Sequence, residues 1–180
     1  MKLKHRFIFP QWIYQLIDIF KEYLPLCWFN SHPLQLTSSE VFFKQNLLFY
    51  FAIEFLTQAN MIPASEALVE VFLATGLTVL FVFLLLSLNR SRHSFVSIVS
   101  AVLFCQNMVA IVCVPIIVWL LTEHSLASYI ALGVLLAWDF ALISYIMKKT
   151  LSINAFASSI VAFIYFVCTY VAAYSFTLAF

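Results

Sequence analysis

The chain has 180 residues, of which 64% are hydrophobic and 9% are charged, and its formal net charge is +1. Globular proteins average about 25% charged residues, so this chain carries too little charge to cover a surface that is exposed to water. The composition therefore excludes a soluble domain and favours a membrane protein. No basic patch interleaved with aromatic residues occurs in a polar segment, which argues against a nucleic-acid partner.

Residues 1–40 are predicted to form a cytoplasmic N-terminal segment. The apolar run in MKLKHRFIFP ends at Pro10, so it is shorter than the core of about 7–15 residues that a signal peptide needs. Between Pro10 and Pro25, apolar and polar side chains separate onto two faces at helical spacing. We expect an amphipathic helix over 11–24, which either lies in the membrane interface or caps the cytoplasmic end of the protein. The stretch 26–39 is too polar and interrupted to cross a membrane.

Five mostly apolar stretches follow, each with the roughly 20 residues that a helix needs to cross about 30 Å of hydrocarbon. The predicted spans are 41–61, 66–88, 96–121, 125–147 and 154–178. The first is the weakest, because it contains Lys44, Asn46, Glu54 and Gln58. The predicted fold class is therefore all-α: a polytopic membrane bundle of five transmembrane helices in residues 41–180, preceded by an N-terminal amphipathic interfacial helix.

Two of the predicted spans have recognisable start signals. The sequence Thr37-Ser38-Ser39-Glu40 fits a capping box ahead of the first span. Pro63, near the start of the second span, suits the first turn of a helix.

The basic residues indicate how the chain is oriented. All nine Lys and Arg fall in residues 1–44, in the loop with Arg90 and Arg92, or in the pair Lys148–Lys149. With five spans these three places lie on one side of the membrane, whereas without the first span they would not. The positive-inside rule then predicts a cytoplasmic N-terminus and an external C-terminus, in the cell inner (plasma) membrane.

A polar stripe runs along the first span, because Asn46, Tyr50, Glu54 and Gln58 recur at i, i+4. Unsatisfied polar groups cost several kcal/mol in lipid, so this stripe is expected to face other helices or a wet cavity. It would serve either as a proton or solute path or as a set of interhelical hydrogen bonds, and we favour the second interpretation.

Two carboxylates lie deep in the predicted spans: Asp139 near the middle of the fourth and Glu54 in the first. No Lys, Arg or His lies at a comparable depth, so we expect either neutral, hydrogen-bonding acids or acids that are wetted by a cavity. We expect Asp139 to donate a hydrogen bond to a neighbouring helix, with the stripe around Glu54 as its partner. Glu70 lies about one turn into its span and is expected to reach the outer interface.

The remaining polar residues predict packing rather than chemistry. Asn107 shares one face of the third span with Ser97 and Ser100, and Pro115 is expected to kink that helix. The four cysteines form no CxxC pair, and the four histidines fall in or beside loops on both sides of the membrane, so neither a metal site nor a disulfide framework is expected. The motifs HExxH, GxSxG and the P-loop do not occur, so we expect no enzyme activity and no cofactor.

Two stretches carry a family resemblance: SFVSIVSAVLFCQNMVAIVCVPI (94–116) and WDFALISYIMKKTLSINAFASSIVAFIYFVCTYVAAY (138–174). Together with the aromatic, proline-bounded head and five spans, they make the chain resemble the Yip family of small integral membrane proteins over about residues 40–180. The likeness is to bacterial inner-membrane members, and the DLYGP-type signature of eukaryotic members does not occur. This resemblance implies a role in membrane organisation or trafficking through helix-mediated partners, and it carries over no catalytic residue.

These observations predict a non-enzymatic membrane scaffold or accessory subunit. Its partners would be the lipid bilayer and a membrane protein or a second copy of the chain, and no small-molecule ligand is indicated. One alternative is a small transporter or proton channel that uses Glu54 and Asp139. Another is a subunit of a larger envelope assembly, such as a secretion machine.

Overall fold

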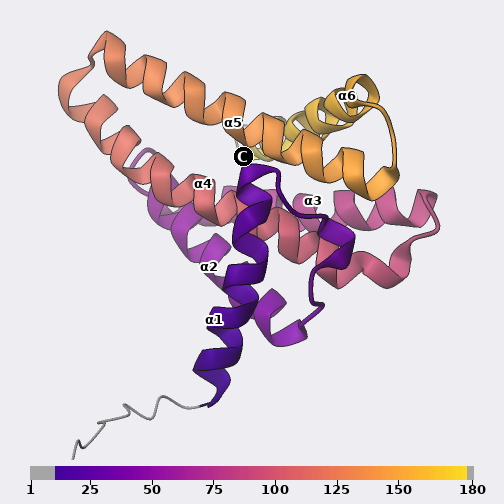
Figure 1. Cartoon of the computed structure of the whole chain (residues 1–180). Helices are drawn as coiled ribbons and strands as arrows, with labels where there is room; N and C mark the ends of the chain where they lie inside the picture. The colour runs from indigo at the N-terminus through magenta and orange to yellow at the C-terminus, as the bar shows by residue number, and fades with distance from the viewer. Residues whose placement is uncertain (1–10, 178–180) are drawn as a thin grey trace, which may run out of the picture.

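The computed structural model describes residues 11–177, and within this range the chain is helical and contains no strand (Figure 1). The all-α prediction is therefore confirmed. The α-helices are α1 (Gln11–Tyr23), α2 (Glu40–Gln58), α3 (Ala64–Leu88), α4 (Phe95–Glu123), α5 (Leu126–Leu151), α6 (Ala155–Phe166) and α7 (Ala172–Thr177). The short 3-10 turns are η1 (Leu24–Trp28), η2 (Pro33–Gln35) and η3 (Arg92–Ser94), and a π-helical turn, η4 (Val167–Val171), joins α6 to α7.

Within residues 11–177, four helical segments are long and apolar enough to cross a membrane: Ala64–Leu88, Arg92–Glu123, Leu126–Leu151 and Ala155–Ser175. They match the last four predicted spans to within a few residues and indicate a multi-pass membrane protein. The first predicted span corresponds to α2, which has 19 residues and does not reach the same apolar character. The reason is its composition, since Glu40, Lys44 and Glu54 all lie within it.

The long helices form a closed ring in which α4 is the most deeply buried member. Helix α4 packs extensively against α2 on one side and α5 on the other, α5 packs against α6, and α3 closes the ring by contacting α2, η4 and α7. Nearly every residue of α4 between Ser97 and Ala110 is buried. The apolar core therefore lies around the first half of α4.

The helix starts differ in detail from the sequence signals. The capping box expected over Thr37–Glu40 is wrong, because Ser39 is the cap of α2 and its Oγ accepts a hydrogen bond from the Phe42 amide at 3.3 Å. Thr37 is bound elsewhere: its amide and its hydroxyl donate to the two carboxylate oxygens of Glu22, at 2.6 and 2.7 Å. Pro63 directly precedes α3, and its carbonyl accepts from the Ala67 amide at 2.9 Å.

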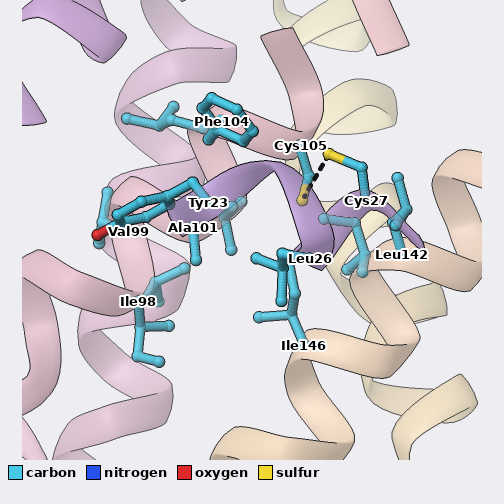
Figure 2. Packing of buried hydrophobic residues seen from close by; sticks show 14 of the residues in the cluster. Tyr23, Leu26, Cys27, Ile98, Val99, Ala101, Phe104, Cys105, Leu142 and Ile146 are labelled. Carbon is cyan, nitrogen blue, oxygen red and sulfur yellow. Dashed lines mark hydrogen bonds between the residues drawn. The ribbon is translucent and has the colours of Figure 1, made fainter. Parts of the chain in front are cut away.

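The segment after α1 is more deeply placed than the sequence indicated. Pro25 lies in the 3-10 turn η1 that follows α1, and Leu26 and Cys27 of this turn are buried. Figure 2 shows Leu26 and Cys27 packed beside Leu142 and Ile146 of α5, with the thiols of Cys27 and Cys105 facing each other at 3.9 Å. The stretch 26–39 does not span, as expected, but its first residues belong to the core.

Hydrogen bonds from α4 and α5 fix the irregular backbone of this segment. The Trp138 indole donates to the Cys27 carbonyl at 3.3 Å, and the Tyr145 hydroxyl donates to the Ser31 carbonyl at 3.0 Å. The Ser97 hydroxyl contacts the carbonyls of Pro33 and Leu36, at 3.1 and 3.2 Å. Non-helical backbone within a membrane protein must be satisfied by protein or by water, and here protein side chains supply the donors.

Helix α1 is joined to the bundle through its last turn. The Phe20 and Tyr23 rings lie against the Phe104 ring of α4, with centroids 5.1 and 5.7 Å apart. Burial raises the pKa of Tyr23 to about 12, and its hydroxyl donates to the Thr37 carbonyl at 2.9 Å. The structure thus contains a helix at the predicted position, while its placement in a membrane interface stays a prediction.

Candidate functional site

Polar residues of α2 turn toward the interior of the bundle and meet polar residues of α4. Asn107 Nδ2 donates to Asn46 Oδ1 at 2.8 Å and to the Asn46 carbonyl at 3.1 Å. Asn46 Nδ2 donates in turn to the Ser100 carbonyl at 3.1 Å. Both asparagine side chains are buried. Two residues that the sequence placed on separate spans are thus brought together, and they tie α2 to α4.

Asp139 is buried in α5, with 4% of its surface exposed, and is bound by α4. Its Oδ1 accepts a hydrogen bond from Gln106 Nε2 at 2.9 Å. The Oε1 of the same amide accepts from the Tyr170 hydroxyl at 3.1 Å. Three side chains therefore form one hydrogen-bonded chain that runs from α5 through α4 to η4.

The partner of Asp139 differs from the one expected. We expected Asp139 to donate to the stripe around Glu54, whereas the observed bond is donated by Gln106 and accepted by the carboxyl group. The reason is the lateral order of the helices: α4 packs against both α2 and α5. A carboxyl group on α5 therefore meets the amide of α4 before it can meet α2.

Tyr170 reaches Gln106 from the π-helical turn η4. A π-helical turn locally widens a helix, and such turns occur frequently at functional sites. Within this part of the chain, the Thr169 hydroxyl donates to the Tyr165 carbonyl at 2.8 Å. The hydroxyls of Tyr165 and Thr78 lie 3.3 Å apart, which joins the last helical segment to α3.

The second feature is a small cavity between α2 and α3. Its lining includes Glu54, Gln58 and Glu70. Tyr50 and Tyr170 also line this cavity, whose volume is about 10 Å³. That is room for about one water molecule. Glu70 lines this cavity and is half-buried, and its place at the outer interface stays a prediction.

Tyr170 belongs to both features. It lines the cavity with Glu54, and it donates to Gln106, which binds Asp139. The Tyr170 hydroxyl is bonded to Gln106, whereas Glu54 is its neighbour in the lining of the cavity. The six predicted polar residues therefore form three sets: Asn46 with Asn107, Glu54 with Gln58 and Glu70, and Asp139 with Gln106.

This arrangement can do two things chemically. It pairs polar groups of neighbouring helices, which holds α2, α4, α5 and η4 in one lateral order. It also places a carboxyl group at the end of a hydrogen-bonded chain beside an acid-lined cavity, as a proton path would require. No group of three or more His, Cys, Asp or Glu side chains that could hold a metal ion occurs in the described part of the chain.

Gln106 and Tyr170 are the two site residues that sequence reasoning missed. Gln106 had a usable signal, because it is a polar residue beside Asn107 in an otherwise apolar run. Tyr170 had no such signal in the sequence, since tyrosine also occurs at membrane interfaces and as an ordinary packing residue.

No family model matches the chain, and no curated protein or solved structure matches it closely enough to count as similar.

Proposed function

We propose that this chain is a non-enzymatic membrane scaffold or accessory subunit that acts through helix–helix contacts with other membrane proteins. The observation that carries the proposal is the pairing of its deep polar residues with one another. Asn46 binds Asn107, Gln106 binds Asp139, and the cavity beside Glu54 has room for about one water. Polar groups used in this way stabilise a bundle and leave little space for a solute.

In this proposal α2 is a fifth transmembrane helix. Its 19 residues, at a rise of 1.5 Å each, extend roughly 28 Å, which is close to the hydrocarbon thickness. Its exposed apolar residues are suited to lipid: Val41, Leu48, Phe49 and Leu56 are all exposed. Its polar residues Asn46 and Tyr50 are buried on the opposite side. The N-terminus would then be cytoplasmic and the C-terminus external in the inner membrane, as the positions of Lys and Arg predict.

The surface between α2 and α3 supports contact with a partner helix. An apolar groove of about 640 Å³ lies there, and Leu48, Phe72 and Gly76 are among the residues that line it. A glycine at a helix surface lets another backbone approach closely. The partner would be a second copy of the chain or a different membrane protein, as the resemblance to the Yip family implies.

Site-specific photo-crosslinking in native membranes tests this proposal. A photoreactive residue at Leu48 faces the groove, and one at Val134 of α5 is a matched control, because the two positions are 71% and 65% exposed. We expect one product of fixed size from position 48 and none from position 134. A product of twice the chain's mass identifies self-association. Equal results at both positions contradict the scaffold proposal.

A second candidate function is a small proton transporter or channel. The observation that favours it is the chain from Tyr170 through Gln106 to Asp139, which begins at the cavity lined by Glu54. The test is pH-driven flux in proteoliposomes, with empty liposomes as the control. Flux above the control that is abolished in correctly folded Asp139→Asn protein favours the transporter, because asparagine cannot release a proton at working pH. The absence of flux favours the scaffold.

The third interpretation, a subunit of a larger envelope assembly, makes a separate prediction about mass. Purification in mild detergent would then give a complex of fixed stoichiometry with several other chains. A scaffold with a single type of partner gives a complex of two kinds of chain or a homo-oligomer.

A further inference from the structure

A polar pocket lies between the segment that follows α1 and the end of α5. It has a volume of about 590 Å³, within the usual range for small-molecule sites. Asn30, Ser31, His32 and Gln35 form one side, and Tyr145 and Lys149 of α5 form the other. None of these residues takes part in the hydrogen bonds around Asp139 or in the cavity beside Glu54.

The pocket contains a cation that has no acidic partner. Lys149 makes no ion pair within the described residues, and its Nζ lies 5.7 Å from the centre of the Tyr145 ring. Glu22 also lines the pocket, but both of its carboxylate oxygens accept hydrogen bonds from Thr37, at 2.6 and 2.7 Å. The oxygens of the acid are thus bound by its own segment, although its charge remains, whereas the ammonium group has no anionic partner among the described residues.

Neutral donors accompany the cation. The Nδ1 of His32 accepts a hydrogen bond from the Leu34 amide at 3.4 Å, so the proton of the neutral ring lies on Nε2, which is then a donor. The side-chain amides of Asn30 and Gln35 also line the pocket, and each NH2 group can donate two hydrogen bonds.

The position of the pocket matches the headgroup region of a membrane. Lys149 is two residues from the end of α5, a helix that is long and apolar enough to cross the bilayer. Trp28, Phe29 and Leu34, on the segment that forms the pocket's other side, are all exposed. Exposed aromatic residues beside a lysine at a helix end are typical of the membrane–water interface.

We propose that this pocket binds the phosphate of an anionic phospholipid headgroup. Lys149 contributes the charge, and the His32 ring and the Gln35 amide contribute hydrogen bonds to phosphate oxygens. The acyl chains extend along the exposed apolar side chains beside the pocket. The inference depends on the membrane placement of α5 and is independent of the scaffold proposal.

Two pairs of variants of the full-length chain distinguish binding at this pocket from an effect of general surface charge. Lys149→Gln removes the charge inside the pocket, and Lys148→Gln removes the neighbouring charge, which is exposed and does not line the pocket. Gln35→Glu adds a negative charge to the pocket lining, and Gln45→Glu adds the same charge at an exposed position of α2. Both members of each pair change the net charge by the same amount.

The measurement is thermal unfolding of the protein in neutral detergent during titration with phosphatidylglycerol. Phosphatidylcholine with the same acyl chains and inorganic phosphate are titrated in parallel. We expect wild type, Lys148→Gln and Gln45→Glu to be stabilised by phosphatidylglycerol more than by phosphatidylcholine. For Lys149→Gln and Gln35→Glu we expect an apparent affinity weaker by about fivefold or more, from roughly 1 kcal/mol per charge at a membrane surface.

Three results would overturn the proposal. Equal loss in Lys148→Gln and Lys149→Gln would assign the effect to general surface charge. Equal stabilisation by phosphatidylcholine would remove the anionic requirement. Equal stabilisation by inorganic phosphate alone would assign the pocket to a soluble anion rather than a lipid. If Lys149→Gln does not fold, the Gln35→Glu and Gln45→Glu pair provides the same comparison without removing any contact of Lys149.

Discussion

Asn46 of α2 and Asn107 of α4 are joined by side-chain hydrogen bonds between two helices. Asn107 Nδ2 donates both to the Asn46 side chain and to its carbonyl, and Asn46 Nδ2 donates to the Ser100 carbonyl of α4. Because these donors and acceptors are buried, this contact fixes how α2 is rotated about its own axis against α4.

The pair should behave as a unit when it is mutated. Asn107→Leu leaves the Asn46 side-chain oxygen unpaired, so we expect a loss of about 1–3 kcal/mol in the free energy of unfolding. The double variant Asn46→Leu/Asn107→Leu should cost less than the sum of the two single variants, because no unpaired partner is left between them. Unfolding in mixed micelles measures these values, and Gln45→Leu, at an exposed neighbouring position, is the control. Strict additivity would contradict the pairing.

Asp139 provides a second test of interhelical bonding. Asp139→Asn keeps an oxygen that can accept from Gln106 Nε2, so we expect a change in unfolding free energy below about 1 kcal/mol. Asp139→Leu leaves the Gln106 amide without its acceptor and should cost about 1–3 kcal/mol. Thermal unfolding in detergent distinguishes the two variants. If both variants were equally destabilised, the hydrogen bond would not be the source of the effect.

The transmembrane placement of α2 predicts that its two ends lie on opposite sides of the membrane. Ser38 precedes α2 and Ser65 follows it in the first turn of α3, and both are exposed. In a background without the four native cysteines, Ser38→Cys should react with a membrane-impermeant thiol reagent only from the cytoplasmic side. Ser65→Cys should react only from outside. Reaction of both from the same side would show that α2 does not cross.

The segment that follows α1 should contribute strongly to stability through Leu26. This side chain is fully buried beside Ile146 (Figure 2), whereas Leu34, on the same segment, is 39% exposed. Leu26→Ala removes packed methyl groups from the core and should cost about 2–5 kcal/mol, while Leu34→Ala should cost less than about 1 kcal/mol. Thermal unfolding measures both. Similar values for the two variants would mean that the segment does not pack as described.

The reactivity of the cysteines tests which of them are buried in protein and which face lipid. Cys27 and Cys105 are buried in the protein, and Cys168 is exposed on η4, which lies in a segment apolar enough to span the membrane. We expect none of the three to react with a water-soluble maleimide in intact membranes, and all to react after denaturation in SDS. Rapid labelling of native Cys168 would place that face of the helix against water rather than lipid.

Several features of this protein follow from the sequence alone, because they depend on local periodicity and composition. Apolar runs of more than 20 residues predict helices with nearly the observed ends, and an i, i+4 spacing places Asn46 and Tyr50 on one buried side of α2. The same reasoning identified Asp139 as a buried acid, since its neighbours in the chain are almost all apolar.

The tertiary structure alone decided which residues meet. The hydrogen bonds Gln106–Asp139 and Tyr170–Gln106 join residues 33 and 64 positions apart, and Trp138 binds a carbonyl 111 positions away. Such contacts depend on the lateral order and rotation of the helices, and helical periodicity determines neither. An irregular segment such as 24–36 has no helical periodicity, so only its packing against α4 and α5 could show that Leu26 and Cys27 belong to the core.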